Sequence, residues 1–193
     1  GGISKIKTDL TKGIVQGNAL WFLASPGLTC MGSLRELRVL GQPAYNDSKG
    51  CGTIMRVAPL AFGLPRDDIR EAAISTSALT HGHVLGQFAA AVWAELIADV
   101  ASGKPLEESA RTLSELYNTF SMEGAEISRC MNAALDAPRD AQPETVESLG
   151  KGWIAEEALS IALYACLATR NLDDGLQCAI IHSGDSDSTG AIA

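Results

Sequence analysis

The last twelve residues of the chain, 182–193, read HSGDSDSTGAIA and bring several oxygen donors together. Asp185 and Asp187 are separated by one residue, and the hydroxyl of Ser188 follows at once. Carboxylate and hydroxyl oxygens suit hard divalent cations, and Mg²⁺ usually takes one or two carboxylates plus water. An aspartate or serine here could instead cap a helix formed by the residues that follow. Spacing alone favours the cap slightly, and the two roles can hold at once.

A second candidate site is the glycine-rich stretch 46–60, NDSKGCGTIMRVAPL. Gly50 and Gly52 flank Cys51, so the backbone amides could approach a ligand without interference from a Cβ atom. Such a turn can bind a phosphate, and Lys49 adds a positive charge. The alternative is a glycine turn that only leads into a buried helix. The spacing matches neither common nucleotide-binding glycine motif, and no cysteine-protease signature surrounds Cys51.

The third candidate is LTHGHVLG, residues 79–86. His81 and His83 are two residues apart, so on a helix they would point to different faces and would not chelate one metal ion together. His81 stands beside Gly82 at a predicted helix junction and could donate a hydrogen bond to a ligand oxygen. For His83 we predict a side chain that is satisfied by the backbone.

Helices must position these residues. Hydrophobic residues make up 46% of the chain and aromatic residues only 5%, which favours helices over β-sandwiches. Apolar periodicity predicts an all-α domain of roughly six or more helices. The segment 154–169 is apolar nearly all round and is predicted to be a central buried helix. Asp67 and Asp173 are predicted N-caps, and residues 25–56 are predicted to form a long ordered loop.

Charge and cysteine content exclude several classes of partner. The formal net charge of −8 argues against nucleic acid and against anionic membranes as general partners. The five cysteines are odd in number and form no CxxC pair, so we expect reduced thiols and a cytoplasmic protein. No apolar run reaches about 18 residues, which predicts no membrane-spanning helix. The start, GGISKIKTDL, is not a signal peptide.

Four segments in this order and spacing resemble the ADP-ribosylglycohydrolase family. They are NDSKGCGTIMRVAPLAF, ALTHGHVLG, GKGWIAEEALSIALYA and HSGDSDSTGAIA, and the resemblance runs from about residue 17 to the end. The resemblance implies a compact, orthogonal multi-helix fold that is all-α. It also implies a pair of Mg²⁺ or Mn²⁺ ions and hydrolysis of the bond that joins ADP-ribose to an acceptor, such as a protein arginine. The partner would be ADP-ribose or an ADP-ribosylated protein.

The same resemblance implies a role for individual residues. Asp185 and Asp187 would be metal ligands and catalytic residues, and Ser188 would be a third metal ligand. His81 would lie near the diphosphate, and Trp153 would lie against the adenine and its ribose. The residues expected to wrap the diphosphate and the distal ribose are Asp47, Ser48, Lys49, Gly50 and Cys51.

One part of the family pattern is missing from this chain. The family has an early Thr-Asp-Asp-Thr element that forms the other metal-binding half, and a Gly-Asp-Ala-Leu-Gly stretch near the N-terminus. KTDLT at 7–11 has a single acid, and GNALW at 17–21 only looks like the second element. We therefore expect one domain over residues 1–193 that is truncated at both ends. A non-catalytic ADP-ribose-binding or immunity module without a complete metal site is the alternative function.

Overall fold

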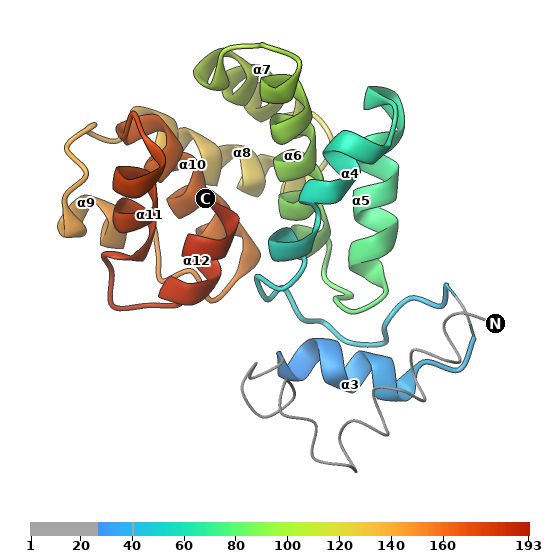
Figure 1. Ribbon diagram of the computed structural model, residues 1–193. Coiled ribbons are helices and arrows are strands. Elements are labelled where there is room, and N and C mark those ends of the chain that lie inside the picture. Colours follow the sequence, from blue (N-terminus) through green and yellow to red (C-terminus); the bar gives the residue numbers. More distant parts are fainter. Residues whose placement is uncertain (1–26, 40) are drawn as a thin grey trace.

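The computed structural model of the protein describes residues 27–39 and 41–193, and these residues form a helical assembly (Figure 1). The 3₁₀-helices are η1 (Ile54–Arg56) and η2 (Arg66–Asp68). The α-helices are α3 (Leu28–Glu36), α4 (Ala58–Gly63), α5 (Ile69–Ala78), α6 (Val84–Ala101), α7 (Leu106–Asn118), α8 (Met122–Asp136), α9 (Pro143–Ser148), α10 (Ala155–Ala168), α11 (Leu172–Ile180) and α12 (Ser186–Ile192). The described ranges contain no strand, only an isolated bridge between Gly50 and Ile154. The all-α prediction is confirmed.

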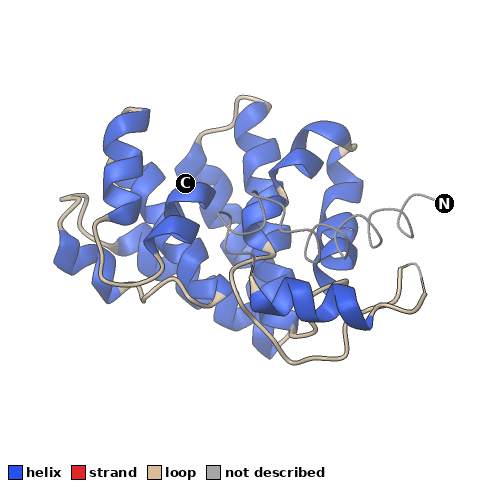
Figure 2. Ribbon diagram, turned by 60° about the horizontal axis from the view of Figure 1, so that its bottom comes forward, coloured by secondary structure: helices blue, strands red, loops and turns tan. Residues whose placement is uncertain are grey.

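Two apolar helices, α6 and α10, form the centre of the molecule. Helix α10 packs against α6, α8, α11 and α12, and every residue from Ala158 to Ala165 is buried. This confirms the predicted central helix, because a helix that is apolar on all sides needs neighbours on all sides. Helices α5 and α7 pair with α6 and α8 respectively (Figure 1), and Figure 2 shows from a second direction that helices make up most of the described chain.

Helix α6 is the one described helix that is long and apolar enough to cross a membrane by length and composition. Its apolar residues have another use in this fold, since α6 packs against α4, α5, α7, α8 and α10. Residues such as Val92 and Leu96 are buried between these helices. Core packing therefore accounts for the composition of α6.

The predicted long loop over residues 25–56 is wrong, because it contains α3 and η1. Helix α3 buries only Met31 and Ser33 and has almost no apolar stripe, so its sequence gives little helical signal. A tertiary contact holds it: the Ser33 hydroxyl donates to the Thr80 carbonyl oxygen at 2.8 Å. Helix α3 is thereby attached to the loop between α5 and α6.

Both predicted N-caps are also wrong. Asp67 lies inside η2, and the residue before α5 is Asp68, whose side chain makes no capping hydrogen bond. Helix α11 is capped by Asn171, whose side chain accepts from the Asp174 amide at 2.9 Å. Asp173 falls two residues later, within the first turn, where its charge still interacts favourably with the helix N-terminus.

Candidate functional site

The glycine-rich loop is joined to the segment that precedes α10. The Cys51 amide donates to the Trp153 carbonyl oxygen at 3.3 Å, and the Ala155 amide donates to the Lys49 carbonyl oxygen at 2.8 Å. These two bonds flank the isolated bridge and form a short antiparallel pairing. Two of the predicted segments, more than 100 residues apart in the sequence, are thus fixed side by side.

The segment that precedes α10 also holds the acidic pair. The Asp185 amide donates to the Lys151 carbonyl oxygen at 2.7 Å. Two glycines make this close approach possible. A Cβ atom on Gly184 would lie 2.0 Å from the Lys151 oxygen, and one on Gly152, which has a φ of 76°, would lie 2.7 Å from Thr189 Cγ2. Larger residues at either position would push the acidic pair away from α10.

A direct side-chain contact closes this three-way junction. The Cys51 thiol donates to Asp185 Oδ2 at 3.2 Å, and the Ser188 side chain also hydrogen-bonds the thiol. Burial, with the Asp185 carboxylate beside it, raises the pKa of Cys51 to about 11. The thiol therefore stays protonated at neutral pH and acts as a hydrogen-bond donor that orients Asp185, not as a nucleophile.

The acidic pair occupies the start of α12 without capping it. Asp185 is the N-cap residue by position, but its side chain makes no capping hydrogen bond. Asp185 and Ser188 are buried, whereas Asp187 is exposed in the first turn. The alternative reading, a carboxylate used as a helix cap, is therefore wrong for the Asp185 side chain.

Thr189 is bound within the protein. Its hydroxyl donates to the Ala179 carbonyl oxygen at 2.7 Å and lies 2.9 Å from His182 Nε2. Thr189 thus ties α12 to the end of α11, and Asp185, Asp187 and Ser188 remain as the oxygen donors of this turn.

These three donors fit a hard divalent cation in their chemistry, because they supply two carboxylates and a hydroxyl. They would form only part of a metal site. Among the described residues, no group of three or more histidine, cysteine, aspartate or glutamate side chains could hold a metal ion. The stretches at 7–11 and 17–21, which were compared with the family's other metal-binding half, lie outside the described residues.

Two amides of the glycine-rich loop that were predicted to face a ligand have partners within the protein. The Cys51 amide is bound to Trp153, and the Gly50 amide is 3.4 Å from Ser48 Oγ. Neither Gly50 nor Gly52 has a positive φ. A Cβ atom on either glycine would lie 3.3 Å from the His81 ring. The glycines therefore make room for His81, which the phosphate-binding prediction did not anticipate.

A Gly50→Val substitution is expected to weaken ADP-ribose binding, because the added side chain would displace the His81 ring beneath the loop. Overpacking of this kind typically lowers folding stability by about 1–3 kcal/mol. Titration calorimetry with ADP-ribose measures the effect, and circular dichroism shows whether the helices persist. Gly63→Val is a matched control, since a Cβ atom there meets nothing within 4 Å. Normal affinity in a folded Gly50→Val protein would contradict the prediction.

The two histidines have separate environments in the loop between α5 and α6. His81 is 2% exposed, and its Nδ1 is 2.8 Å from the Thr80 hydroxyl. Burial, together with the nearby Arg56 cation, lowers the pKa of His81 to about 4, so the ring is neutral at physiological pH. His83 is the N-cap of α6, and its Nδ1 accepts from the Leu85 amide at 3.1 Å. The prediction that the backbone satisfies His83 is confirmed, and the ligand contact of His81 stays a prediction.

Folding stability is expected to fall as the pH drops, and His81 should account for part of the loss. The folded state keeps His81 neutral down to a pKa of about 4, whereas the unfolded chain takes up a proton near the ordinary value of 6.5. Protons therefore favour the unfolded state in this window, at a cost of about 2 kcal/mol between about pH 7.5 and about pH 5. Urea unfolding at the two pH values tests this. His81→Gln should lose less stability over the same interval, and equal losses in both proteins would refute the prediction.

The remaining predicted ligand residues face solvent to different degrees. The Trp153 side chain is 61% exposed, while its carbonyl holds Cys51. Asp47 is exposed and Ser48 half-buried, with Ser48 Oγ 3.2 Å from the Thr29 hydroxyl. An exposed indole beside the loop is free to stack on a base. Its contact with adenine stays a prediction.

Sequence reasoning missed Glu156. The Lys49 ammonium forms an ion pair with Glu156 Oε1, so Lys49 is not the free cation that was predicted for the loop. Glu156 lies in the first turn of α10 and is buried. The only sequence signal is the pair of glutamates that begins this otherwise apolar helix.

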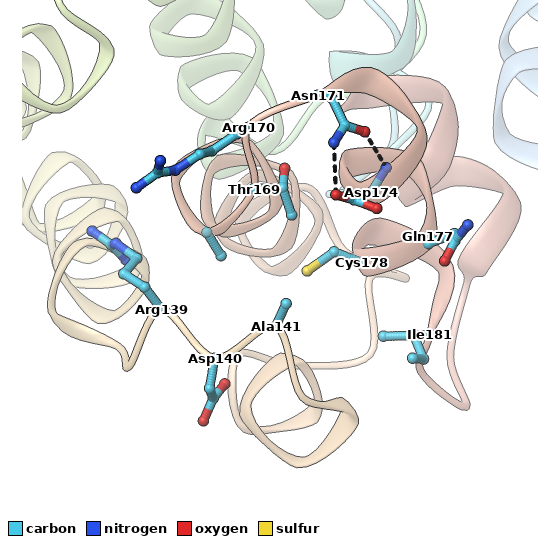
Figure 3. Close-up of a pocket in the computed structure, with 11 residues that line it drawn as sticks. Arg139, Asp140, Ala141, Thr169, Arg170, Asn171, Asp174, Gln177, Cys178 and Ile181 are labelled. Carbon is cyan, nitrogen blue, oxygen red and sulfur yellow. Dashed lines mark hydrogen bonds between the residues drawn. The ribbon is translucent and has the colours of Figure 1, made fainter.

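A separate cavity of about 510 Å³ lies between the loop after α8 and the start of α11 (Figure 3). None of the predicted site residues lines it. Its Arg139 guanidinium donates to the carbonyl oxygens of Ala134 and Leu135 and so caps α8. Asn171 and Asp174 bond to each other on the opposite side, as Figure 3 shows. These polar groups are used by the fold itself.

The helical fold, the acidic turn and the glycine-rich loop together point to one family of hydrolases, and a family model identifies it. The family model described as ADP-ribosylglycohydrolase matches residues 6–193. The chain therefore belongs to the ADP-ribosylglycohydrolase family, whose members hydrolyse ADP-ribose linkages.

One solved structure shows the same fold. It is described as an "ADP-ribosylglycohydrolase-related protein complex", with 22% sequence identity and a TM-score of 0.68. The match covers 100% of this chain and 68% of that one. A comparison with curated protein sequences found no match.

Proposed function

We propose that this protein is a metal-dependent hydrolase that releases ADP-ribose from an ADP-ribosylated acceptor, such as a protein arginine. The observation that carries the proposal is the contact between the Cys51 thiol and Asp185 Oδ2. It puts the loop predicted to bind the diphosphate and distal ribose directly beside the acids predicted to hold a cation. Family membership supplies the reaction class.

Asp185, Asp187 and Ser188 would hold Mg²⁺ or Mn²⁺. Such an ion, when bound, polarises sugar hydroxyls and activates water. Cys51 would keep the Asp185 carboxylate aimed at the ion by donating its proton to one oxygen. Trp153 would stack on the adenine, and Ser48 would bind the sugar-phosphate part of the ligand.

A second function is supported by one observation. The sequence lacks the Thr-Asp-Asp-Thr element that forms the other half of the metal site in the family. A chain with only this half of a metal site could bind ADP-ribose or an ADP-ribosylated protein without cutting it. In that case the chain itself would act as a binding or immunity module.

One experiment separates the two functions. An arginine-ADP-ribosylated protein is incubated with the chain in Mg²⁺ or Mn²⁺, with and without EDTA, and free ADP-ribose is measured by chromatography. Release that EDTA abolishes supports the hydrolase. Binding of ADP-ribose by calorimetry without any release supports the binding module, and neither release nor binding would refute both.

We also propose a cytoplasmic location. The proposal is supported by the five cysteines, all of which are free thiols in the structure. Thiols persist in reducing compartments.

A further inference from the structure

Glu156 is a buried carboxylate with a single partner. The residue is 3% exposed, Oε1 pairs with the Lys49 ammonium, and Oε2 is buried without any hydrogen-bond partner. A buried charge is costly unless it is paired and hydrogen-bonded. Lys49 is the one ion-pair partner of Glu156 among the described residues, and the Arg129 cation adds a weaker attraction from further away. Breaking the Lys49 pair is therefore costly.

The Lys49–Glu156 pair anchors the glycine-rich loop at two adjacent points of α10. The Lys49 side chain is bound to Glu156, and the Lys49 carbonyl oxygen accepts from the amide of Ala155, the preceding residue, at 2.8 Å. Cys51 follows two residues later and contacts Asp185. A continuous path of contacts thus runs from α10 through the loop to the acidic pair.

Lys49 has two possible roles toward an anionic ligand. Its side chain is 35% exposed, so the ammonium could leave Glu156 for a diphosphate. That move would leave both Glu156 oxygens buried without a partner, whereas the diphosphate has water available. The balance favours an ammonium that stays on Glu156, because the charge that gains most from pairing is the one that water cannot reach.

We propose that Glu156 is a positioning residue for the ADP-ribose site. It holds Lys49, and through Lys49 it fixes the loop that contacts the ligand and Asp185. The inference rests on the proposed binding of ADP-ribose. It assigns Lys49 to loop placement and not to direct contact with phosphate.

The test is a double-mutant cycle on ADP-ribose affinity, measured by titration calorimetry with the full chain. Glu156→Gln and Lys49→Met should each weaken binding about tenfold, because each loses the charge-assisted contact. The double variant should bind no more weakly than either single variant, since all three lack the same contact. If Lys49 contacts phosphate directly, Glu156→Gln should bind as tightly as the unmodified chain or more tightly, and this result would overturn the inference.

Glu126→Gln is the matched control. Glu126 carries the same charge near Lys49 but is bonded to Arg129 instead. Removing a nearby carboxylate can only favour an anionic ligand, so this variant should bind at least as tightly as the unmodified chain. A loss of affinity equal to that of Glu156→Gln would show that the effect is not specific to the Lys49–Glu156 pair and would contradict the inference.

Kinetics and folding separate positioning from simple destabilisation. In hydrolysis assays Glu156→Gln should raise KM about tenfold with kcat nearly unchanged, because ground-state binding is affected. If that variant does not fold, Lys49→Met with Glu156→Met replaces the buried pair by apolar side chains and should fold. Weak binding by this folded protein shows that the loss does not come from unfolding, and normal binding refutes the inference.

The unmodified chain distinguishes this inference from the proposed function. If it binds no ADP-ribose, the proposed function fails and the inference fails with it. If it binds ADP-ribose and every pair variant binds equally well, only the inference fails.

Discussion

Asp187→Asn is expected to reduce release of ADP-ribose from an arginine-modified protein by at least about 100-fold, without loss of stability. The side chain is exposed, and the structure gives its carboxylate no hydrogen-bond or ion-pair partner among the described residues. A neutral amide keeps the shape but removes the charge that a divalent cation needs. Calorimetry with Mg²⁺ or Mn²⁺ should show weaker metal binding in the same protein.

A control for this variant comes from α11. Asp173→Asn removes an exposed carboxylate from the first turn of another short helix, away from the loop junction. Its hydrolysis and metal binding should match those of the unmodified chain. Unchanged metal titration in Asp187→Asn would remove Asp187 from the metal site, and equal losses in both variants would point to net charge alone.

The sequence predicted the helices whose composition matches their burial. Residues 154–169 are apolar on all sides and became the buried α10. Helix α3 was missed because it buries only two residues and depends on a hydrogen bond from Ser33 to the Thr80 carbonyl, 47 residues away. Caps were misplaced because aspartates cluster near these helix starts, and the local pattern cannot tell a cap from a first-turn acid.

The site was predicted as a set of segments and not as a set of contacts. Cys51 and Asp185 are 134 residues apart, and Lys49 and Glu156 are 107 apart. Spacing along the chain carries no information on pairs so distant. Lys49 therefore looked like a free cation, and Gly50 looked like an opening for a ligand where the fold needed space for His81. In both cases the local chemistry was assigned to a ligand before the protein's own partners were known.

The largest expected effect on stability comes from a carboxylate outside the candidate site. Glu95, on α6, is buried and accepts hydrogen bonds from Arg66 Nη1 at 2.8 Å, Arg70 Nη2 at 2.7 Å and the Tyr117 hydroxyl at 2.7 Å. Burial and the neighbouring Glu95 raise the pKa of Tyr117, so its hydroxyl stays protonated and donates. One carboxylate thus joins η2, α5 and α7 to α6.

Glu95→Ala should lower the free energy of unfolding by about 3–5 kcal/mol, because it leaves the Arg70 guanidinium and the buried Tyr117 hydroxyl without their acceptor and removes one of the two acceptors of Arg66. Urea unfolding measures the change. Glu107→Ala is the control: it breaks an ion pair with Arg111 in which both side chains are about half exposed, and such pairs contribute about 0–1 kcal/mol. Arg66 keeps its bonds to Asp99. A Glu95→Ala loss near the lower end of the expected range would mean that Asp99 compensates Arg66 for the missing carboxylate. A Glu95→Ala loss as small as that of Glu107→Ala would show that the buried network does not hold the α5–α6–α7 packing together.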